Sequence, residues 1–167
     1  MSTSGSRNEP VEVRLGKVLA AHGLTVACAE SCTGGLVTSR LTDIAGSSAY
    51  VMGSVVSYSN EVKEKLVGVQ HATLAAHGAV SEETAREMAE GVRRAVGTDV
   101  GLATTGIAGP GGGTAEKPVG LVYTAVATAA GTTVRENHFT GTRTEVKRQA
   151  SEVVLTMALD ALPQQES

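Results

Sequence analysis

Apolar residues recur at helical spacing in several stretches of this chain. The spacing predicts helices over residues 10–22, 33–42, 59–67, 81–96 and 143–162. Gly23 and Gly68 end two of these stretches, as glycine commonly does after a helix. Ser81 is a typical N-cap, and Thr142 with Glu145 three residues later forms a capping-box pattern at the start of the last helix.

Short apolar runs bounded by turn residues predict the strands. The expected strands cover residues 25–29, 50–58, 100–105, 120–127 and 132–139. The last two flank Ala130-Gly131, as the strands of an antiparallel hairpin do, whereas helical stretches separate the others. The pattern therefore predicts an α/β fold, a three-layer α/β/α sandwich with a mixed sheet of about five strands.

Length and composition fit one domain. No repeat or second boundary interrupts the 167 residues, so we expect a polar, disordered tail over residues 1–9 and a single domain over 10–163. Two cysteines, Cys28 and Cys32, are too few for a disulfide framework and fit reduced thiols. Because no signal-peptide core and no run of about 18 apolar residues is present, we expect a cytoplasmic protein without membrane contact.

Charge and aromatic content argue against nucleic acid as a partner. The net charge is −3, and three Tyr, one Phe and no Trp supply neither a basic stripe nor stacking platforms. The four histidines are scattered without metal-ligand spacing, so no metal is expected. These observations favour a small molecule as the partner.

Residues 25–35, TVACAESCTGG, combine an apolar run with a reactive turn. The turn carries, in order, Ser31, Cys32, Thr33, Gly34 and Gly35. Hydroxyl and thiol side chains either cap a helix or attack a carbonyl, and glycines let backbone amides approach an anion closely. On this segment alone a helix cap is the favoured interpretation. Whether Glu30 orients the turn or caps the helix stays open.

A second glycine-rich segment, residues 104–120, follows the third predicted strand. It lacks the Gly-Lys-Ser/Thr end of a P-loop, and Glu116 stands where a dinucleotide-binding turn needs its third glycine. ATP and NAD therefore have no sequence support, and no cofactor is expected. A flexible connection and a ligand-binding loop are equally good interpretations of this segment. Thr105 and Gly106 lie at the edge where open α/β sheets bind ligands.

The segment YSNEVKEKL, residues 58–66, brings a phenol and two lysines. Lys65 stands four residues after Glu61, a spacing typical of a solvent-exposed pair. Lys63 lies on another helix face beside apolar positions, where a surface lysine with a packed stem is the favoured interpretation. A general base there would need its pKa lowered from about 10.4 toward 7, which burial can supply.

Five ordered motifs are similar to those of the CinA C-terminal-domain family: AESCTGG (29–35), TDIAGSS (42–48), VVSYSNEVKEKLVGV (55–69), HGAVSEE (77–83) and TGIAGPGGGTAEKPVG (105–120). The resemblance covers about residues 11–162. It implies a metal-free amidohydrolase of pyridine nucleotide recycling, which converts nicotinamide mononucleotide to nicotinate mononucleotide and ammonia. The family's reactive serine falls on Ser31, its lysine on Lys63 and its tyrosine on Tyr58, which reverses both interpretations favoured above.

The implied mechanism is acyl transfer. Neutral Lys63 takes the Ser31 proton, directly or through Tyr58, and Ser31 attacks the carboxamide carbon. Candidate binding residues are Thr33, Gly34 and Gly35, whose amides face the oxyanion, and Ser48, Thr105, Gly106 and Arg143 for the sugar phosphate. Lys147 stands where the family carries an arginine and keeps the positive charge.

Alternatives to this mechanism stay open. Cys32 is a rival nucleophile, since a thiol at a helix N-terminus has a lowered pKa. A module that binds a pyridine nucleotide without turnover and a competence-associated interaction protein are the non-enzymatic alternatives. Some family members carry an additional N-terminal molybdopterin-binding-like domain. Because 167 residues that begin at the amidase motifs leave no room for it, we expect the stand-alone form, with which a homo-oligomer is compatible.

Overall fold

The computed structural model describes residues 8–163, so most of the predicted tail lies outside the described residues. In order, the elements are α1 (Val11–His22), β1 (Val26–Glu30), α2 (Leu36–Thr42), the 3₁₀ turn η1 (Ser47–Ala49), β2 (Val51–Val56), α3 (Asn60–Val67), α4 (His71–His77), α5 (Glu82–Val96), β3 (Val100–Gly106), β4 (Leu121–Thr128), β5 (Gly131–His138) and α6 (Arg143–Ala161). Glu9, at the end of the predicted tail, forms an ion pair with Lys17 at 2.8 Å.

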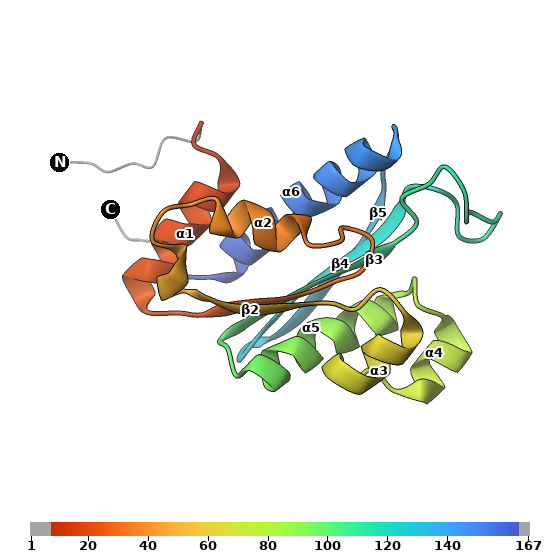
Figure 1. The fold of residues 1–167 in the computed structure, drawn as a ribbon, viewed down its shortest axis with the longest axis horizontal. Helices are drawn as coiled ribbons and strands as arrows, with labels where there is room; N and C mark the ends of the chain where they lie inside the picture. The colour runs from red at the N-terminus through yellow and green to blue at the C-terminus, as the bar shows by residue number, and fades with distance from the viewer. Residues whose placement is uncertain (1–7, 164–167) are drawn as a thin grey trace.

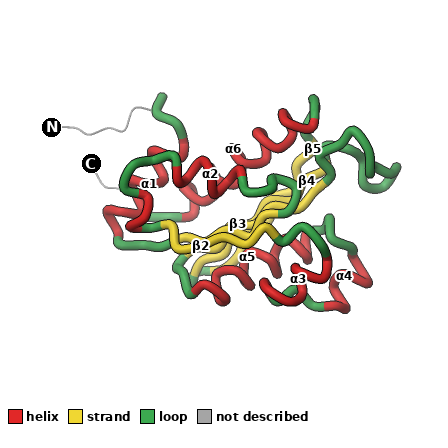
Figure 2. Tube along the Cα trace, viewed as in Figure 1, coloured by secondary structure: helices red, strands yellow, loops and turns green. Residues whose placement is uncertain are grey.

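One sheet forms the middle layer, with the strand order β2-β1-β3-β4-β5. β1 pairs in parallel with both β2 and β3, and the pairs β3–β4 and β4–β5 are antiparallel. Helices α1, α2 and α6 cover one face, and α3, α4 and α5 cover the other (Figures 1 and 2). The predicted three-layer sandwich with a mixed sheet is confirmed.

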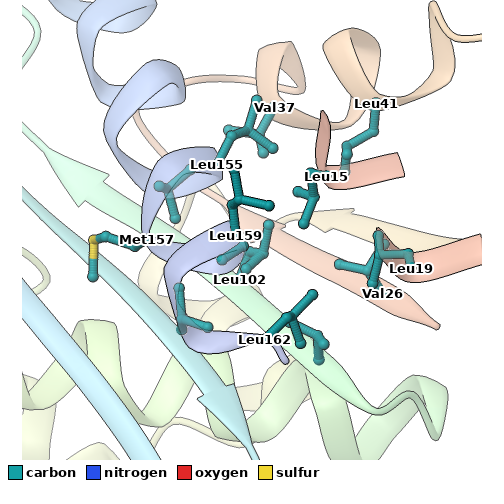
Figure 3. Close-up of a cluster of buried hydrophobic side chains, with 14 of the residues drawn as sticks. Leu15, Leu19, Val26, Val37, Leu41, Leu102, Leu155, Met157, Leu159 and Leu162 are labelled. Atoms are coloured by element: carbon teal, nitrogen blue, oxygen red, sulfur yellow. The ribbon is translucent and has the colours of Figure 1, made fainter. Parts of the chain in front are cut away.

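The larger hydrophobic core lies between the sheet and helices α1, α2 and α6. Leu15 and Leu19 of α1 meet Leu155 of α6 over Leu102 of β3 (Figure 3). Each of these leucines is fully or almost fully buried, which stabilises the fold by roughly 1.5–3 kcal/mol per side chain. This packing fixes α2 and α6 above the sheet, the two helices that border the candidate site.

The opposite face of the sheet has a core of smaller side chains, largely alanine and valine. A Cβ built at Gly101 of β3 would clash with the Ala89 carbonyl oxygen of α5. Glycine is therefore needed for α5 to approach the sheet this closely. The tight packing holds β1 and β3 in one fixed register on the α5 side.

Two α-helices differ from the sequence prediction, β2 ends at Val56 and not at residue 58, and the short turn η1 was not predicted. α2 begins at Leu36 and not at residue 33, because Gly34 and Gly35 have φ of +60° and +106°, values that glycine adopts without strain. α4 was not predicted; its seven residues include no buried side chain and no side-chain cap, so the sequence carries little helical signal there.

Candidate active site

Ser31 lies at the carboxyl edge of the parallel strands. Its amide donates to the Thr104 carbonyl oxygen of β3 at 3.0 Å, and the Ser57 amide, just past β2, donates to the Glu30 carbonyl oxygen at 2.8 Å. The end of β1 is thus held by both neighbouring strands. We call residues 31–35 the elbow. Its position is the edge at which open α/β sheets bind their ligands.

Lys63 is brought to Ser31 by α3. Ser59 caps this helix by accepting a hydrogen bond from the Val62 amide, so the helix starts directly after β2. The Lys63 side chain is 1% exposed, and its Nζ lies 3.1 Å from Ser31 Oγ. The surface-lysine interpretation drawn from spacing alone is therefore wrong for Lys63, whereas Lys65 is exposed as expected.

Two backbone carbonyls complete the surroundings of the Lys63 amine. Nζ donates to the Ser57 carbonyl oxygen at 2.7 Å and to the Tyr58 carbonyl oxygen at 3.0 Å. A neutral amine has two N–H groups, and with both held by carbonyls its lone pair is left for the Ser31 hydroxyl. Burial lowers the pKa of Lys63 to about 8, so a base is available from mildly alkaline pH upward.

Cys32 is buried to the same extent as Ser31, so exposure does not distinguish the two side chains. It is 7% exposed, and burial raises the pKa of its thiol to about 12. Burial also raises the pKa of Cys28, in the middle of β1. Because the thiolate is the nucleophilic form, a buried thiol with a raised pKa is inert. The geometry favours Ser31 over Cys32 as the nucleophile, because the Lys63 amine lies 3.1 Å from Ser31 Oγ.

Tyr58 contributes its backbone to Lys63 and its phenol to α6. The phenol is 64% exposed and accepts a hydrogen bond from Arg143 Nη2 at 3.4 Å. Arg143 Nη1 donates to the Gly109 carbonyl oxygen at 2.7 Å. The structure thus joins Tyr58 and Arg143, and the contact between Lys63 and Ser31 is direct, without the phenol between them.

The first turns of α6 carry two cations, one at the elbow and one at Tyr58. Arg143 is the first residue of the helix, and Lys147 follows one turn later. The Lys147 Nζ lies 3.6 Å from the position that a Cβ on Gly34 would occupy. A positive charge in the first turn opposes the helix dipole, and the hydrogen bonds of Arg143 to Gly109 and Tyr58 offset this cost. Lys147 makes the surroundings of Gly34 attractive to an anion, and Arg143 adds positive charge at Tyr58, whose carbonyl oxygen contacts Lys63.

The elbow amides are not equivalent as hydrogen-bond donors. The Gly34 amide donates to the Ser31 carbonyl oxygen at 3.1 Å, and the Gly35 amide to Glu30 Oε1 at 3.2 Å. Within residues 8–163 the Thr33 amide donates to no other group. Of the three predicted oxyanion donors, Thr33 alone keeps a free N–H in the described chain.

The remaining candidates do not converge on Ser31. Thr105 is buried and donates to the Ala79 carbonyl oxygen at 2.7 Å, and Gly106 is paired with Val122 of β4. Ser48 lies in η1, before β2, and β2 runs parallel to β1. It therefore lies at the opposite edge of the sheet, about 20 Å of strand away from the elbow. The motif that contains Ser48 did not indicate at which end of the strands this residue lies.

Two buried polar residues of the site were not among the predicted site residues. Glu30 is 1% exposed and accepts from the Thr33 hydroxyl at 2.6 Å, while Thr104 is hydrogen-bonded to the same hydroxyl at 2.7 Å. The signal for Glu30 was a carboxylate at the end of an apolar strand, directly before the reactive serine. Thr104 had no signal of its own beyond its place at a strand end.

We also searched the described residues for a metal site and for a membrane-spanning helix. In the part of the chain that the structure describes, no three His, Cys, Asp or Glu side chains are grouped so that they could hold a metal ion. None of the helices between residues 8 and 163 combines the length and the apolar character that crossing a bilayer requires.

Solved structures share this architecture. The competence/damage inducible protein CihA from Agrobacterium tumefaciens superposes with a TM-score of 0.87 at 43% identity, covering 90% of this chain and 93% of that one. A CinA superfamily protein from Escherichia coli gives a TM-score of 0.88 at 30% identity, over 97% of this chain and 94% of that one.

Sequence relatives point the same way. A CinA-like protein from Chloroherpeton thalassium is 60% identical over 121 residues, which are 72% of this chain and 29% of that protein. One from Geobacter sulfurreducens is 49% identical over 152 residues, 91% of this chain and 36% of that protein. The chain spans about a third of the length of the curated relatives it matches. The sequence model of the CinA C-terminal domain matches residues 8–162. This protein belongs to the CinA C-terminal domain family.

Proposed function

We propose that this protein hydrolyses the carboxamide of nicotinamide mononucleotide, giving nicotinate mononucleotide and ammonia. The observation that carries the proposal is the buried amine of Lys63, 3.1 Å from the Ser31 hydroxyl and with a pKa lowered to about 8. A serine paired with a desolvated lysine is an arrangement suited to acyl transfer. The resemblance described above supplies the substrate.

The reaction has two halves. Neutral Lys63 accepts the Ser31 proton as Oγ bonds to the carboxamide carbon, and the carbonyl oxygen becomes an oxyanion. The Lys63 ammonium returns the proton to the amide nitrogen, the C–N bond breaks, and ammonia departs, so that Ser31 carries the acyl group of nicotinate mononucleotide as an ester. Water, deprotonated by Lys63, then cleaves the ester and restores Ser31.

Two features of the site support binding of the substrate's charges. The Thr33 amide has no acceptor in the described chain and follows the nucleophile by two residues, so we assign it to the oxyanion. Arg143 and Lys147 supply positive charge for a phosphate beside the elbow. In this assignment Thr105 does not bind the substrate. It keeps its hydrogen bond to the Ala79 carbonyl oxygen, which joins the end of β3 to the segment before α5.

A direct assay tests the proposal. Purified protein is incubated with nicotinamide mononucleotide, and ammonia and nicotinate mononucleotide are measured together, with free nicotinamide as a substrate lacking the sugar phosphate. We expect equal amounts of the two products and slow turnover of free nicotinamide. Binding of the nucleotide without ammonia release would overturn the proposal and favour a non-catalytic binding module.

A further inference from the structure

Glu30 holds a buried carboxylate directly before the nucleophile. It is 1% exposed, and each carboxylate oxygen accepts several hydrogen bonds. Oε1 accepts from the Thr33 hydroxyl at 2.6 Å, the Gly35 amide at 3.2 Å and the Val37 amide at 2.9 Å. Oε2 accepts from the amide and the hydroxyl of Thr38, at 2.9 and 2.6 Å. Every one of these donors belongs to the elbow or to the first turn of α2.

These bonds close a ring around Ser31. A carboxylate only accepts, so the Thr33 hydroxyl donates to Glu30 and receives the hydrogen bond of the Thr104 hydroxyl, at 2.7 Å. The Thr104 carbonyl oxygen in turn accepts from the Ser31 amide at 3.0 Å. The residues before and after the nucleophile are therefore tied to each other and to β3.

The same carboxylate decides which amides remain for a ligand. It occupies the amides at the start of α2, the donors that would otherwise attract an external anion. The Thr33 amide is left without an acceptor in the described chain. We infer that Glu30 is the positioning residue of the elbow: through Thr33 and Gly35 it holds Ser31 Oγ at Lys63 and directs the free Thr33 amide toward the oxyanion. The inference rests on the proposed function.

Glu30→Gln tests this role. The amide keeps the shape of the carboxylate but turns an NH₂ donor toward backbone and hydroxyl donors, so the ring opens. We expect kcat to fall about 10-fold to 100-fold, the cost of a small misplacement of reacting groups, while KM stays within about 3-fold. The pH at which activity rises stays unchanged, because burial of Lys63 sets it.

A second readout needs no knowledge of the substrate. A fluorophosphonate probe forms an Oγ–P bond with Ser31, releases fluoride and leaves the serine proton on Lys63. We expect its labelling rate in Glu30→Gln to fall by the same factor as kcat. If wild type is labelled but releases no ammonia from nicotinamide mononucleotide, the proposed substrate is wrong. The labelling rates of wild type and Glu30→Gln then still test the positioning role of Glu30. If wild type is not labelled, both proposals fail.

Two further variants separate positioning from folding. Thr33→Val removes the hydroxyl that joins Glu30 to Thr104 and leaves the carboxylate with its backbone donors, so kcat and labelling should fall even if Glu30→Gln does not fold. Thr42→Val on α2 is the matched control: its exposed hydroxyl donates to the Thr38 and Ser39 carbonyl oxygens and not to Glu30, so both rates should stay within about 3-fold of wild type. Wild-type rates in folded Glu30→Gln or Thr33→Val, or equal losses in Thr42→Val, would overturn the inference.

Discussion

Two glycine-rich segments follow neighbouring strands of one sheet, and they differ in what their polar groups do. The elbow follows β1, and in it Ser31 and Thr33 are buried and hydrogen-bonded to other buried groups. The loop of residues 107–120 follows β3 and projects beyond the ends of β3 and β4 (Figure 1). Most of its residues are exposed.

The loop is held at a few points by backbone acceptors. Lys117 Nζ donates to the His77 carbonyl oxygen at 2.6 Å, and the Thr114 amide donates to the Lys117 carbonyl oxygen at 2.8 Å. Arg143 donates to the carbonyl oxygen of Gly109. These contacts shape the loop, and none of them involves Ser31 or Lys63.

The comparison shows that glycine content does not distinguish a reactive turn from a connecting loop. Both segments contain glycines with positive φ. The difference is that buried polar side chains converge on the elbow, where low solvent access shifts a pKa and fixes geometry. Substitutions in the elbow should therefore change kcat, whereas substitutions that loosen the loop should change stability or KM.

The largest effect is expected from the nucleophile itself. Ser31→Ala removes the attacking oxygen and should reduce ammonia release to background, a loss of at least about 10⁴-fold. Cys32→Ala, one residue along, removes a buried protonated thiol and should keep substantial activity. The ammonia assay on both variants, with circular dichroism to show folding, checks this. The opposite result would assign the nucleophile to Cys32.

The second effect concerns the base. Lys63→Met keeps much of the packing of the side chain and removes the amine, so turnover should fall about 10²-fold to 10⁴-fold, the usual contribution of general-base catalysis. Lys65→Met, on the exposed side of the same helix, should leave turnover within about 2-fold. Turnover of both variants, measured at saturating substrate, tests this prediction. Equal activities would mean that another group activates Ser31.

The third effect is the pH dependence of the wild type. Lys63 must be neutral to accept a proton, and burial lowers its pKa to about 8. Below that pH the ammonium dominates, so kcat/KM should fall about tenfold for each unit of decreasing pH and level off above the pKa. Initial rates between pH 6 and 10 test this. A flat profile would remove Lys63 deprotonation from the rate-determining half-reaction.

The fold was predictable because helices, strands and the hairpin have periods and caps of their own. The site was less so. Lys63 stood beside apolar positions, as a surface lysine with a packed stem does, and its amine is held by the Ser57 and Tyr58 carbonyl oxygens after β2, which the helix pattern does not include. Ser48 shared a motif with site residues but lies at the opposite sheet edge. The sequence placed Glu30 beside Ser31, yet its hydrogen bonds to α2 appear only in three dimensions.

The smallest effect is expected in the loop. Lys117→Met removes the charge-assisted hydrogen bond to the His77 carbonyl oxygen, at the border between the loop and α4. A partly exposed bond of this kind contributes on the order of 1 kcal/mol, which corresponds to a thermal midpoint about 2–4 °C lower for a chain of this size.

In the same variant kcat should stay within about 2-fold of wild type, because the Lys63 and Ser31 contacts lie in the elbow and do not involve Lys117. Lys65→Met is the matched control, since it removes an exposed lysine that supports no loop. Thermal melts and steady-state rates on the two variants separate stability from catalysis. A loss of kcat in Lys117→Met comparable to that in Lys63→Met would place the loop in the catalytic machinery and remove the contrast between the two segments.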